Sequence, residues 1–197
     1  MSVNLSETIQ KNLGYPPLHK ADPNSQEVKD SAAQPDVNLL GQGTIPATLT
    51  GLYRYVQTDE GAADFLRGDN STDWADRLFN WDKNMAVRKI AGYADQPAIA
   101  VENEIDKVAN EAVKVVKANL PENAGIKEVK LFFNDQRNSI LSYLPAALHV
   151  GDILNDAELD DKTNKMEGPI STLMHNLGSV FSKPVTEDEL KENENNK

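Results

Sequence analysis

Three histidines, His19, His149 and His175, are the side chains best suited to bind a metal or transfer a proton near neutral pH. None has a second histidine or a carboxylate at the spacing of a His-x-x-x-His or Glu-x-x-His motif. His149 follows an apolar stripe, where we expect a hydrogen-bonded structural imidazole. His19 and His175 are expected at the surface. The histidines therefore predict no metal site and no metal cofactor.

A second candidate for chemistry is the acidic set Asp152, Asp156 and Asp160, which are spaced by four residues. On a continuous helix these carboxylates would share one face and could bind a hard cation. However, like charges at this spacing weaken a helix, and the ligand order of an EF-hand loop with its central glycine is missing. We therefore expect a solvated loop rather than metal ligands.

Other catalytic motifs are missing from the sequence. There is no cysteine, which excludes disulfides, thiol nucleophiles and thiolate metal sites. The sequence has no Gly-x-Ser-x-Gly nucleophile motif, no phosphate-binding Gly-x-x-x-x-Gly-Lys and no dinucleotide-binding glycine pattern. We assign no catalytic, cofactor-binding or metal-binding residue, and the sequence favours a protein that is not an enzyme.

The two tryptophans, Trp74 and Trp81, are seven residues apart and would lie on one side of a helix. Because large aromatic side chains are mostly buried, we expect them to anchor the core. The alternative is a groove for a partner or ligand, with polar edges supplied by Tyr53, Tyr55 and Tyr93.

The composition limits the class of protein. The 197 residues fit one domain with tails. The net charge of -11 argues against nucleic acid as a partner. No secretory signal pattern and no run of eighteen apolar residues are found, so we expect a cytoplasmic protein without a membrane span.

The apolar spacing predicts helices throughout. Residues 97–119 should form the longest helix, and Gly92 and Gly68 should end shorter ones. Residues 126–133 and 139–154 should form two separate helices. In the longest helix the expected buried positions are Val101, Ile105, Val108, Ala112 and Val115, and the expected outer positions are Glu102, Glu104, Lys107, Glu111 and Lys114.

Two stretches place a proline among apolar residues at helical spacing, around Pro46 and Pro145. A proline in the first turn of a helix sacrifices no hydrogen bond. We therefore expect each proline to begin a new helix after a bend, with Thr44 and Ser142 as caps. The alternative at each place is one long kinked helix.

These elements predict an all-α fold: a single compact domain of short helices with one longer helix, an extended N-terminal arm and an acidic C-terminal tail. The expected divisions are residues 1–35 for an N-terminal helix and Pro-rich arm, 36–182 for the helical domain and 183–197 for a disordered acidic tail.

The run Leu40-Gly-Gln-Gly-Thr-Ile-Pro-Ala-Thr-Leu-Thr-Gly-Leu52, continued by Thr58-Asp-Glu-Gly-Ala-Ala-Asp-Phe-Leu66, resembles the opening of the YidB-like bacterial family. Downstream, Gln136-Arg-Asn-Ser-Ile-Leu-Ser-Tyr-Leu-Pro-Ala-Ala-Leu148 is similar to a segment of its longer members. The chain is poorer in Gly and Leu than that family and more charged. The resemblance implies an all-helical bacterial cytoplasmic protein and no particular reaction.

Three functions are open at this point. The sequence favours a non-catalytic protein-interaction or structural module, whose partner is another protein or a second copy of the chain. The first alternative is a binder of an apolar small molecule or lipid between helices held apart by Pro- and Gly-bent segments. The second is a hydrolase or metal enzyme whose Asp and His residues meet only in the folded protein.

Overall fold

A stretch without any charged side chain, from Leu39 to Leu52, forms the central helix of the protein. The computed structural model describes residues 3–21, 38–68 and 72–151, and in it helix α2 (Leu39–Tyr55) begins at an Asn38 cap. The Asn38 side-chain oxygen accepts a hydrogen bond from the Gly41 amide at 3.0 Å. Twelve consecutive residues, Gly41–Leu52, are buried, so α2 is enclosed on all sides.

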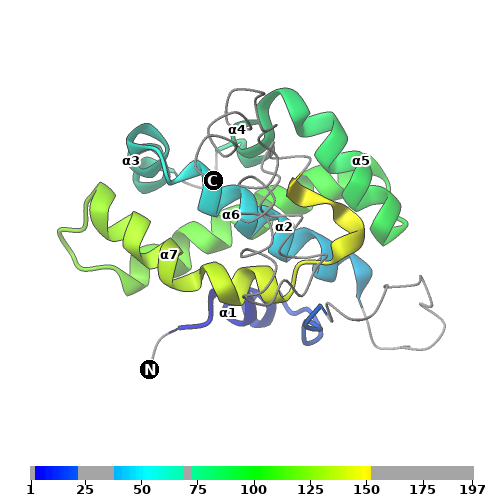
Figure 1. Ribbon diagram of the computed structural model, residues 1–197, viewed down its shortest axis with the longest axis horizontal. Helices are drawn as coiled ribbons and strands as arrows, with labels where there is room; N and C mark the ends of the chain where they lie inside the picture. Colours follow the sequence, from blue (N-terminus) through cyan, green and yellow to red (C-terminus); the bar gives the residue numbers. More distant parts are fainter. Residues whose placement is uncertain (1–2, 22–37, 69–71, 152–197) are drawn as a thin grey trace, which may run out of the picture. The chain divides into compact units, whose positions relative to one another are not determined.

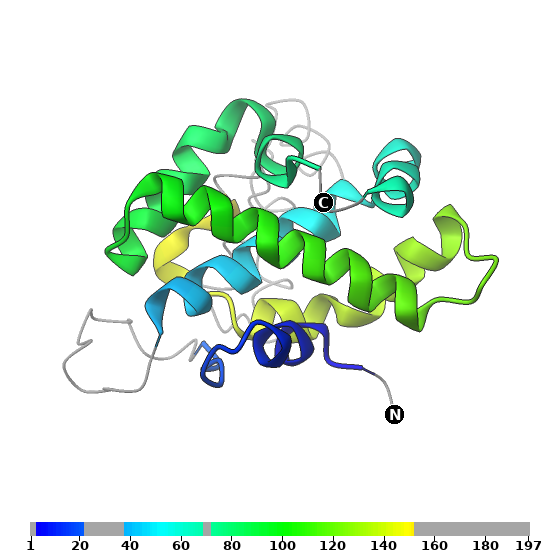
Figure 2. The ribbon, with the colours of Figure 1, turned by 180° about the vertical axis from the view of Figure 1, so that it is seen from behind.

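Five helices pack against α2, and Figures 1 and 2 show it between them. The described residues form helices and contain no strand, so the predicted all-α class is confirmed. Helix α3 (Asp59–Arg67) packs against α7 and α6, and two short 3-10 helices, η1 (Asn80–Asp82) and η2 (Ala146–Leu148), follow α4 and α7. The helices against α2 are α1 (Leu5–Asn12), α4 (Trp74–Phe79), α5 (Lys83–Ala94), α6 (Ala98–Asn119) and α7 (Ile126–Ser142).

Glycines in α2 allow two of these helices to approach closely. A Cβ atom on Gly43 would lie 2.9 Å from the Tyr93 ring of α5. A Cβ atom on Gly51 would lie 3.4 Å from the Cβ atom of Leu78 in α4. These glycines therefore sit at tight contacts between helices.

Pro46 does not begin a helix, and that prediction was wrong. It is the eighth residue of α2, which continues through it as one helix, and Thr44 is buried inside the helix instead of capping one. A proline within a helix costs about 3 kcal/mol. Burial of an Ile or Leu side chain gains about 1.5 to 3 kcal/mol, and Ile45, Leu49 and Leu52 are all fully buried. The burial of the whole helix outweighs the lost hydrogen bond.

Pro145 does mark a bend, as predicted. Helix α7 ends at Ser142, and Pro145 is the extended residue before η2. Ser142 is not a cap, however, because its hydroxyl donates back to the Ser139 carbonyl at 2.8 Å. The two similar proline sequences therefore have different structures.

The longest helix, α6, agrees with the prediction to within one residue, and its five expected core positions are all buried. Glu104 was expected outside, but its exposed fraction is only 5%. The helices predicted at 126–133 and 139–154 were also wrong, because α7 runs unbroken to Ser142. Similarly, α5 passes through Gly92 and ends at Ala94, and the next residue, Asp95, adopts the left-handed conformation.

The expected N-terminal helix is α1, and residues 15–21 of the expected arm pack on the helical core. All described residues belong to one compact unit. The expected acidic tail, residues 183–197, lies outside the described residues. Within the described ranges, no helix has the length and apolar character needed to cross a bilayer.

Asn80, which follows α4 and is the first residue of η1, adopts φ 42° and ψ -116°, a conformation that favours glycine. We predict that Asn80→Gly raises the free energy of unfolding by about 1 kcal/mol, because the backbone strain is relieved. Urea denaturation followed by circular dichroism measures this value. The control is Asn103→Gly in the exposed middle of α6, which should lower stability by a few tenths of a kcal/mol. Equal effects at both positions would contradict strain at Asn80.

Candidate functional site

A polar cluster joins α2, α3 and α4 around the Asp64 carboxylate. The Tyr55 hydroxyl donates to Asp64 Oδ2 at 2.6 Å, and the Arg77 guanidinium donates to the same oxygen. Arg67 lies 3.5 Å from the other carboxylate oxygen. The cluster is positioned by Thr58, whose hydroxyl accepts from the Gly61 amide at 2.9 Å and so fixes the start of α3.

Trp74 forms the apolar base of this cluster. The Trp74 and Tyr55 rings meet edge-on, with their centroids 6.4 Å apart. The Arg77 guanidinium carbon lies 6.0 Å from the centroid of the Trp74 ring. The indole N–H donates to Asn110 Oδ1 at 2.9 Å. Trp74 is fully buried, which confirms its predicted role as a core anchor.

The electrostatics of the cluster do not suit acid or base catalysis. The hydrogen bond from Arg77, followed by that from Tyr55, lowers the pKa of Asp64 below its ordinary value. Burial, followed by the hydrogen bond to Asp64, raises the pKa of Tyr55 above its ordinary value. A catalytic acid or base works best when its pKa is near the operating pH. Both pKa values move away from neutrality. The hydrogen bond between Tyr55 and Asp64 joins α2 to α3.

Asp106 of α6 is also committed to structure. Its Oδ1 atom accepts from the backbone amides of Trp74 and Ala75 at 2.9 and 3.1 Å, in the first turn of α4. Burial raises the pKa of this carboxyl, and the two amides partly counter that effect. Asp106 thereby satisfies two of the amides that a helix start leaves without partners.

A second polar layer attaches α1 to α7. The Leu5 amide donates to Gln136 Oε1 at 2.9 Å, and the Tyr143 hydroxyl donates to Glu7 at 2.7 Å. Burial and the Glu7 hydrogen bond raise the pKa of Tyr143. The N-terminal helix is thus held by groups more than a hundred residues away in sequence.

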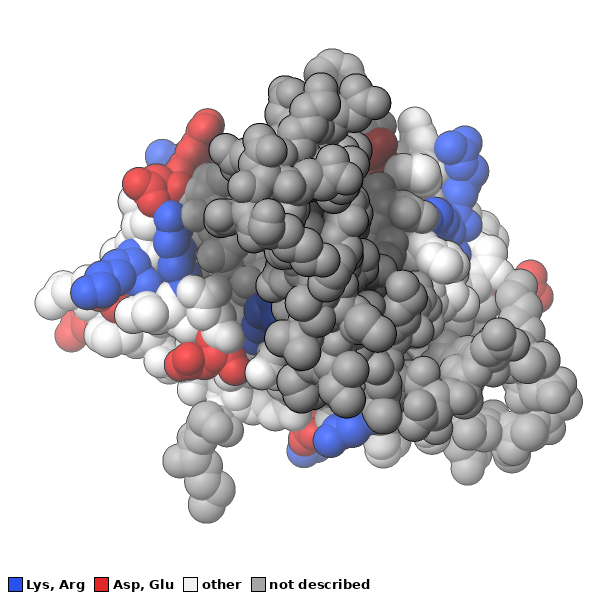
Figure 3. Space-filling model, viewed as in Figure 1, with Lys and Arg blue, Asp and Glu red and all other residues white. Residues whose placement is uncertain are grey.

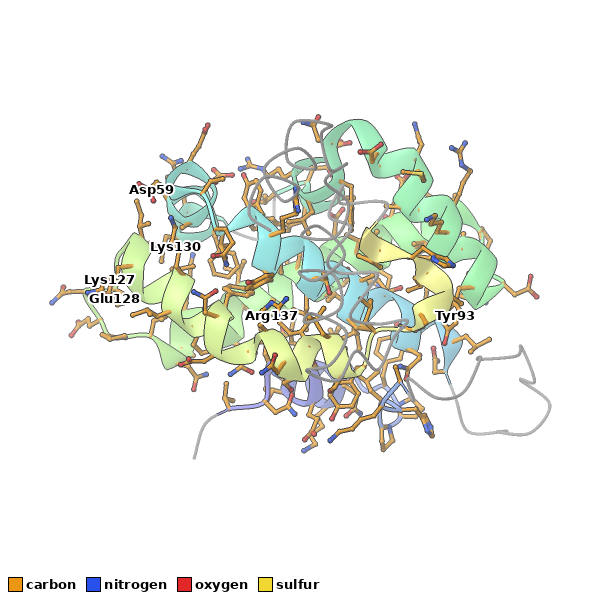
Figure 4. All side chains as sticks on the ribbon, viewed as in Figure 1. Asp59, Tyr93, Lys127, Glu128, Lys130 and Arg137 are labelled. Carbon is orange, nitrogen blue, oxygen red and sulfur yellow. The ribbon has the colours of Figure 1, made fainter. Side chains whose placement is uncertain are left out.

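The three tyrosines proposed as the edge of a groove have separate contacts. Tyr55 binds Asp64, Tyr53 lies under the Arg137 guanidinium at 5.9 Å, and Tyr93 packs on Gly43. Figure 4 shows Tyr93 and Arg137 on different helices. The side chain of Trp81 lies outside the described residues.

The histidines provide no common site among the described residues. His19 is exposed, as expected. His149 is also exposed and has φ 45° after η2, whereas we expected a structural imidazole beside the apolar stripe. Within residues 3–21, 38–68 and 72–151, no group of three side chains is arranged to hold a metal ion. His175, Asp152, Asp156 and Asp160 lie outside the described residues.

Sequence reasoning missed the polar residues that organise the interior: Gln42, Asp64, Glu104, Asp106 and Gln136. Gln42 carried a signal, because it is a long polar side chain within an otherwise small and apolar helix. Gln136 and Asp106 have partners 131 and 31 to 32 residues away in the sequence, so spacing alone could not identify them.

Comparisons with protein families, curated proteins and solved structures gave no match to this chain.

Asp64 should stabilise the protein in a pH-dependent way. Because its folded pKa is lowered, its contribution is present above the unfolded pKa and is lost as the pH falls through the folded value. We predict that Asp64→Asn lowers the free energy of unfolding by about 1 to 2 kcal/mol at neutral pH. Urea denaturation at several pH values should show the difference from wild type closing below about pH 4. The control Asp135→Asn, at an exposed position of α7, should show no such difference. If the Asp64→Asn variant stayed less stable than wild type at acidic pH, the ionic explanation would be contradicted.

Buried hydroxyls in α2 provide a second stability test. The Thr48 hydroxyl is buried without a hydrogen-bond partner, whereas the equally buried Thr50 donates to the Pro46 carbonyl at 2.7 Å. We predict that Thr48→Val raises the free energy of unfolding by about 1 kcal/mol, because it removes an unsatisfied polar group. Thr50→Val should lower it by about 0.5 to 1 kcal/mol. Thermal and urea denaturation distinguish the two variants, and destabilisation by Thr48→Val would show that its hydroxyl has a partner in solution.

Proposed function

We propose that this chain is a non-catalytic helical module that binds another protein. The supporting observation is that the ionisable groups in its polar clusters join helices to one another. Asp64 connects α2, α3 and α4, Asp106 holds the start of α4, and Tyr143 binds Glu7 of α1. Ionisable groups in these hydrogen bonds position the helices. We infer that the protein acts through the surface of this helical scaffold.

The surface chemistry favours a protein partner over a nucleic acid. Lys and Arg nearly balance Asp and Glu in the described ranges, so most of the net charge of -11 comes from the remaining sequence. Figure 3 shows both signs on the described parts of one face. Asp59 and Lys130 form one such mixed pair at 2.6 Å, and Figure 4 shows it between α3 and α7. A mixed surface suits contacts with another protein.

Among the described residues, two large apolar side chains are exposed and provide candidate contact points. Leu131 of α7 is 52% exposed, and Ile99 in the first turn of α6 is 64% exposed. Leu131 lies one helical turn after Lys127, so an apolar and a charged group are adjacent on one face of α7. We place the partner contact at Leu131, because charge beside an apolar anchor favours specific recognition.

The apolar-ligand alternative has less support. It required glycine segments that hold helices apart, but Gly43 and Gly51 lie at close helix contacts. The resemblance to the YidB-like family stays part of this proposal, together with a bacterial cytoplasmic location. In its support, the two runs that carry the resemblance, 40–52 and 58–66, lie in α2 and in α3 with its Thr58 cap.

Photo-crosslinking tests the proposed contact. A photoreactive amino acid at Leu131, in cells that naturally express the chain, should give one adduct of discrete mass. The same group at Asn103, exposed on α6, should not. Leu131→Glu should abolish recovery of the partner while changing the free energy of unfolding by less than about 0.5 kcal/mol. If the photoreactive group forms no adduct at Leu131 and none at Ile99, the proposal is contradicted.

A further inference from the structure

An extended segment, residues 15–21, crosses the core after α1 and is called the strap. It follows Gly14, whose φ of 75° turns the chain out of the helix. The strap residues Pro16, Pro17, His19 and Lys20 are exposed. Tyr15 and Leu18 are partly buried and pack against the core. The strap therefore lies on the protein as an extended ligand would, with two side chains inward and the others in solvent.

The buried side chain of Gln42 recognises the strap backbone. Its Oε1 atom accepts from the His19 amide at 2.8 Å, and its Nε2 atom donates to the His19 carbonyl at 3.0 Å. The same Nε2 atom donates to the Tyr143 carbonyl at 2.9 Å, which fixes the orientation of the amide. Gln42 thus binds both the backbone amide and the backbone carbonyl of His19, and these contacts do not involve the His19 side chain.

A further backbone contact lies two residues on. The Ala21 amide donates to the Ser142 carbonyl at 2.8 Å, where α7 ends. Pro16 and Pro17 have no amide hydrogen, and proline favours an extended backbone before and at its own position. The contacts from Gln42 and Ser142 therefore hold a segment that is already extended, which lowers the entropy lost on binding.

Tyr15 occupies a fitted position at the beginning of the strap. A Cβ atom on Gly41 would lie 2.6 Å from the Tyr15 ring, so only glycine leaves room for it. The Tyr15 hydroxyl is hydrogen bonded to Glu104 of α6, and burial together with this bond raises the pKa of Tyr15. The buried Glu104 carboxylate also accepts a hydrogen bond from Lys107 Nζ at 3.0 Å, so both contacts compensate its burial.

The receiving groups are more deeply buried than the strap itself. Gln42 is 6% exposed and Glu104 is 5% exposed, whereas His19, whose backbone Gln42 binds, is exposed. If the strap left, Gln42 would lose both of its hydrogen bonds to His19, and a buried polar group without a partner is costly. A second peptide with the same features would restore those hydrogen bonds. Replacing the strap by such a peptide therefore costs less free energy than leaving the site empty.

We propose that the surface formed by Gly41, Gln42, Glu104 and Ser142 is a peptide-binding site, and that the strap is its resident ligand. The partner is a protein with an extended, proline-containing segment that carries a tyrosine three residues before a leucine. This inference rests on the proposed protein-binding function. It assigns that function a second surface, formed by residues other than the Leu131 contact.

The test uses a fluorescent peptide with the sequence of residues 14–21 and the full chain carrying Tyr15→Ala and Leu18→Ala. These substitutions weaken the strap but leave α1 unchanged. Fluorescence anisotropy should show saturable binding to this variant. Binding to wild type should be weaker by about tenfold or more, because the tethered strap competes at high effective concentration.

The matched control changes the ligand and leaves the protein unaltered. A peptide N-methylated at the position of His19 lacks the hydrogen that Gln42 Oε1 accepts, and its affinity should fall by about tenfold. Equal binding of the methylated peptide, or no binding of the parent peptide to a folded variant, would overturn the proposal. A dimer formed by the variant through strap exchange would instead assign the site to a second copy of the chain and overturn the partner assignment.

A measurement on the wild-type chain covers the case in which the variant does not fold. Excess unlabelled peptide should accelerate hydrogen exchange at the His19 and Ala21 amides, because it displaces the strap. Unchanged exchange at saturating peptide would overturn the proposal. If crosslinking at Leu131 succeeds while the peptide fails, the strap site is wrong and the protein-binding function stands.

Discussion

The burial of residues Gly41–Leu52 of α2 is the constraint on which the other contacts depend. A helix enclosed by five others must present small residues where neighbours approach, and Gly43 and Gly51 fulfil this requirement. It must also keep a continuous backbone, which explains why Pro46 is accommodated within it. The apolar surface removed from water by Ile45, Leu49 and Leu52 outweighs the local cost of that proline.

The buried polar groups follow from the same enclosure. Three of these polar side chains satisfy backbone groups that helix ends or extended segments would otherwise leave without partners. Asp106 accepts two amides of α4, Gln136 accepts the Leu5 amide, and Gln42 pairs with His19. Polar side chains in this interior therefore specify where each element lies, and the apolar contacts supply most of the stability.

The sequence predicted the fold class and the longest helix because their signals are local. The stripe from Val101 to Val115 has helical spacing, and Pro97 and Pro121 bound it. Pro46 and Pro145 have nearly identical neighbours, yet one lies inside a helix and the other between helices, because burial by distant residues decides between them. Glu104 likewise has the spacing of an outer position, and its burial involves a contact with Tyr15, which is distant in the sequence. Tertiary contacts of this kind leave no trace in short-range spacing.

The attachment of α1 also constrains the order in which the chain can fold during translation. The Leu5 amide and its acceptor Gln136 are separated by 131 positions, and Tyr143 and Glu7 by 136. The first helix has therefore left the ribosome long before its binding surface on α7 is synthesised. Until then its apolar residues have no native neighbours there, so the N-terminal region must complete its docking after the rest of the helical body has been made.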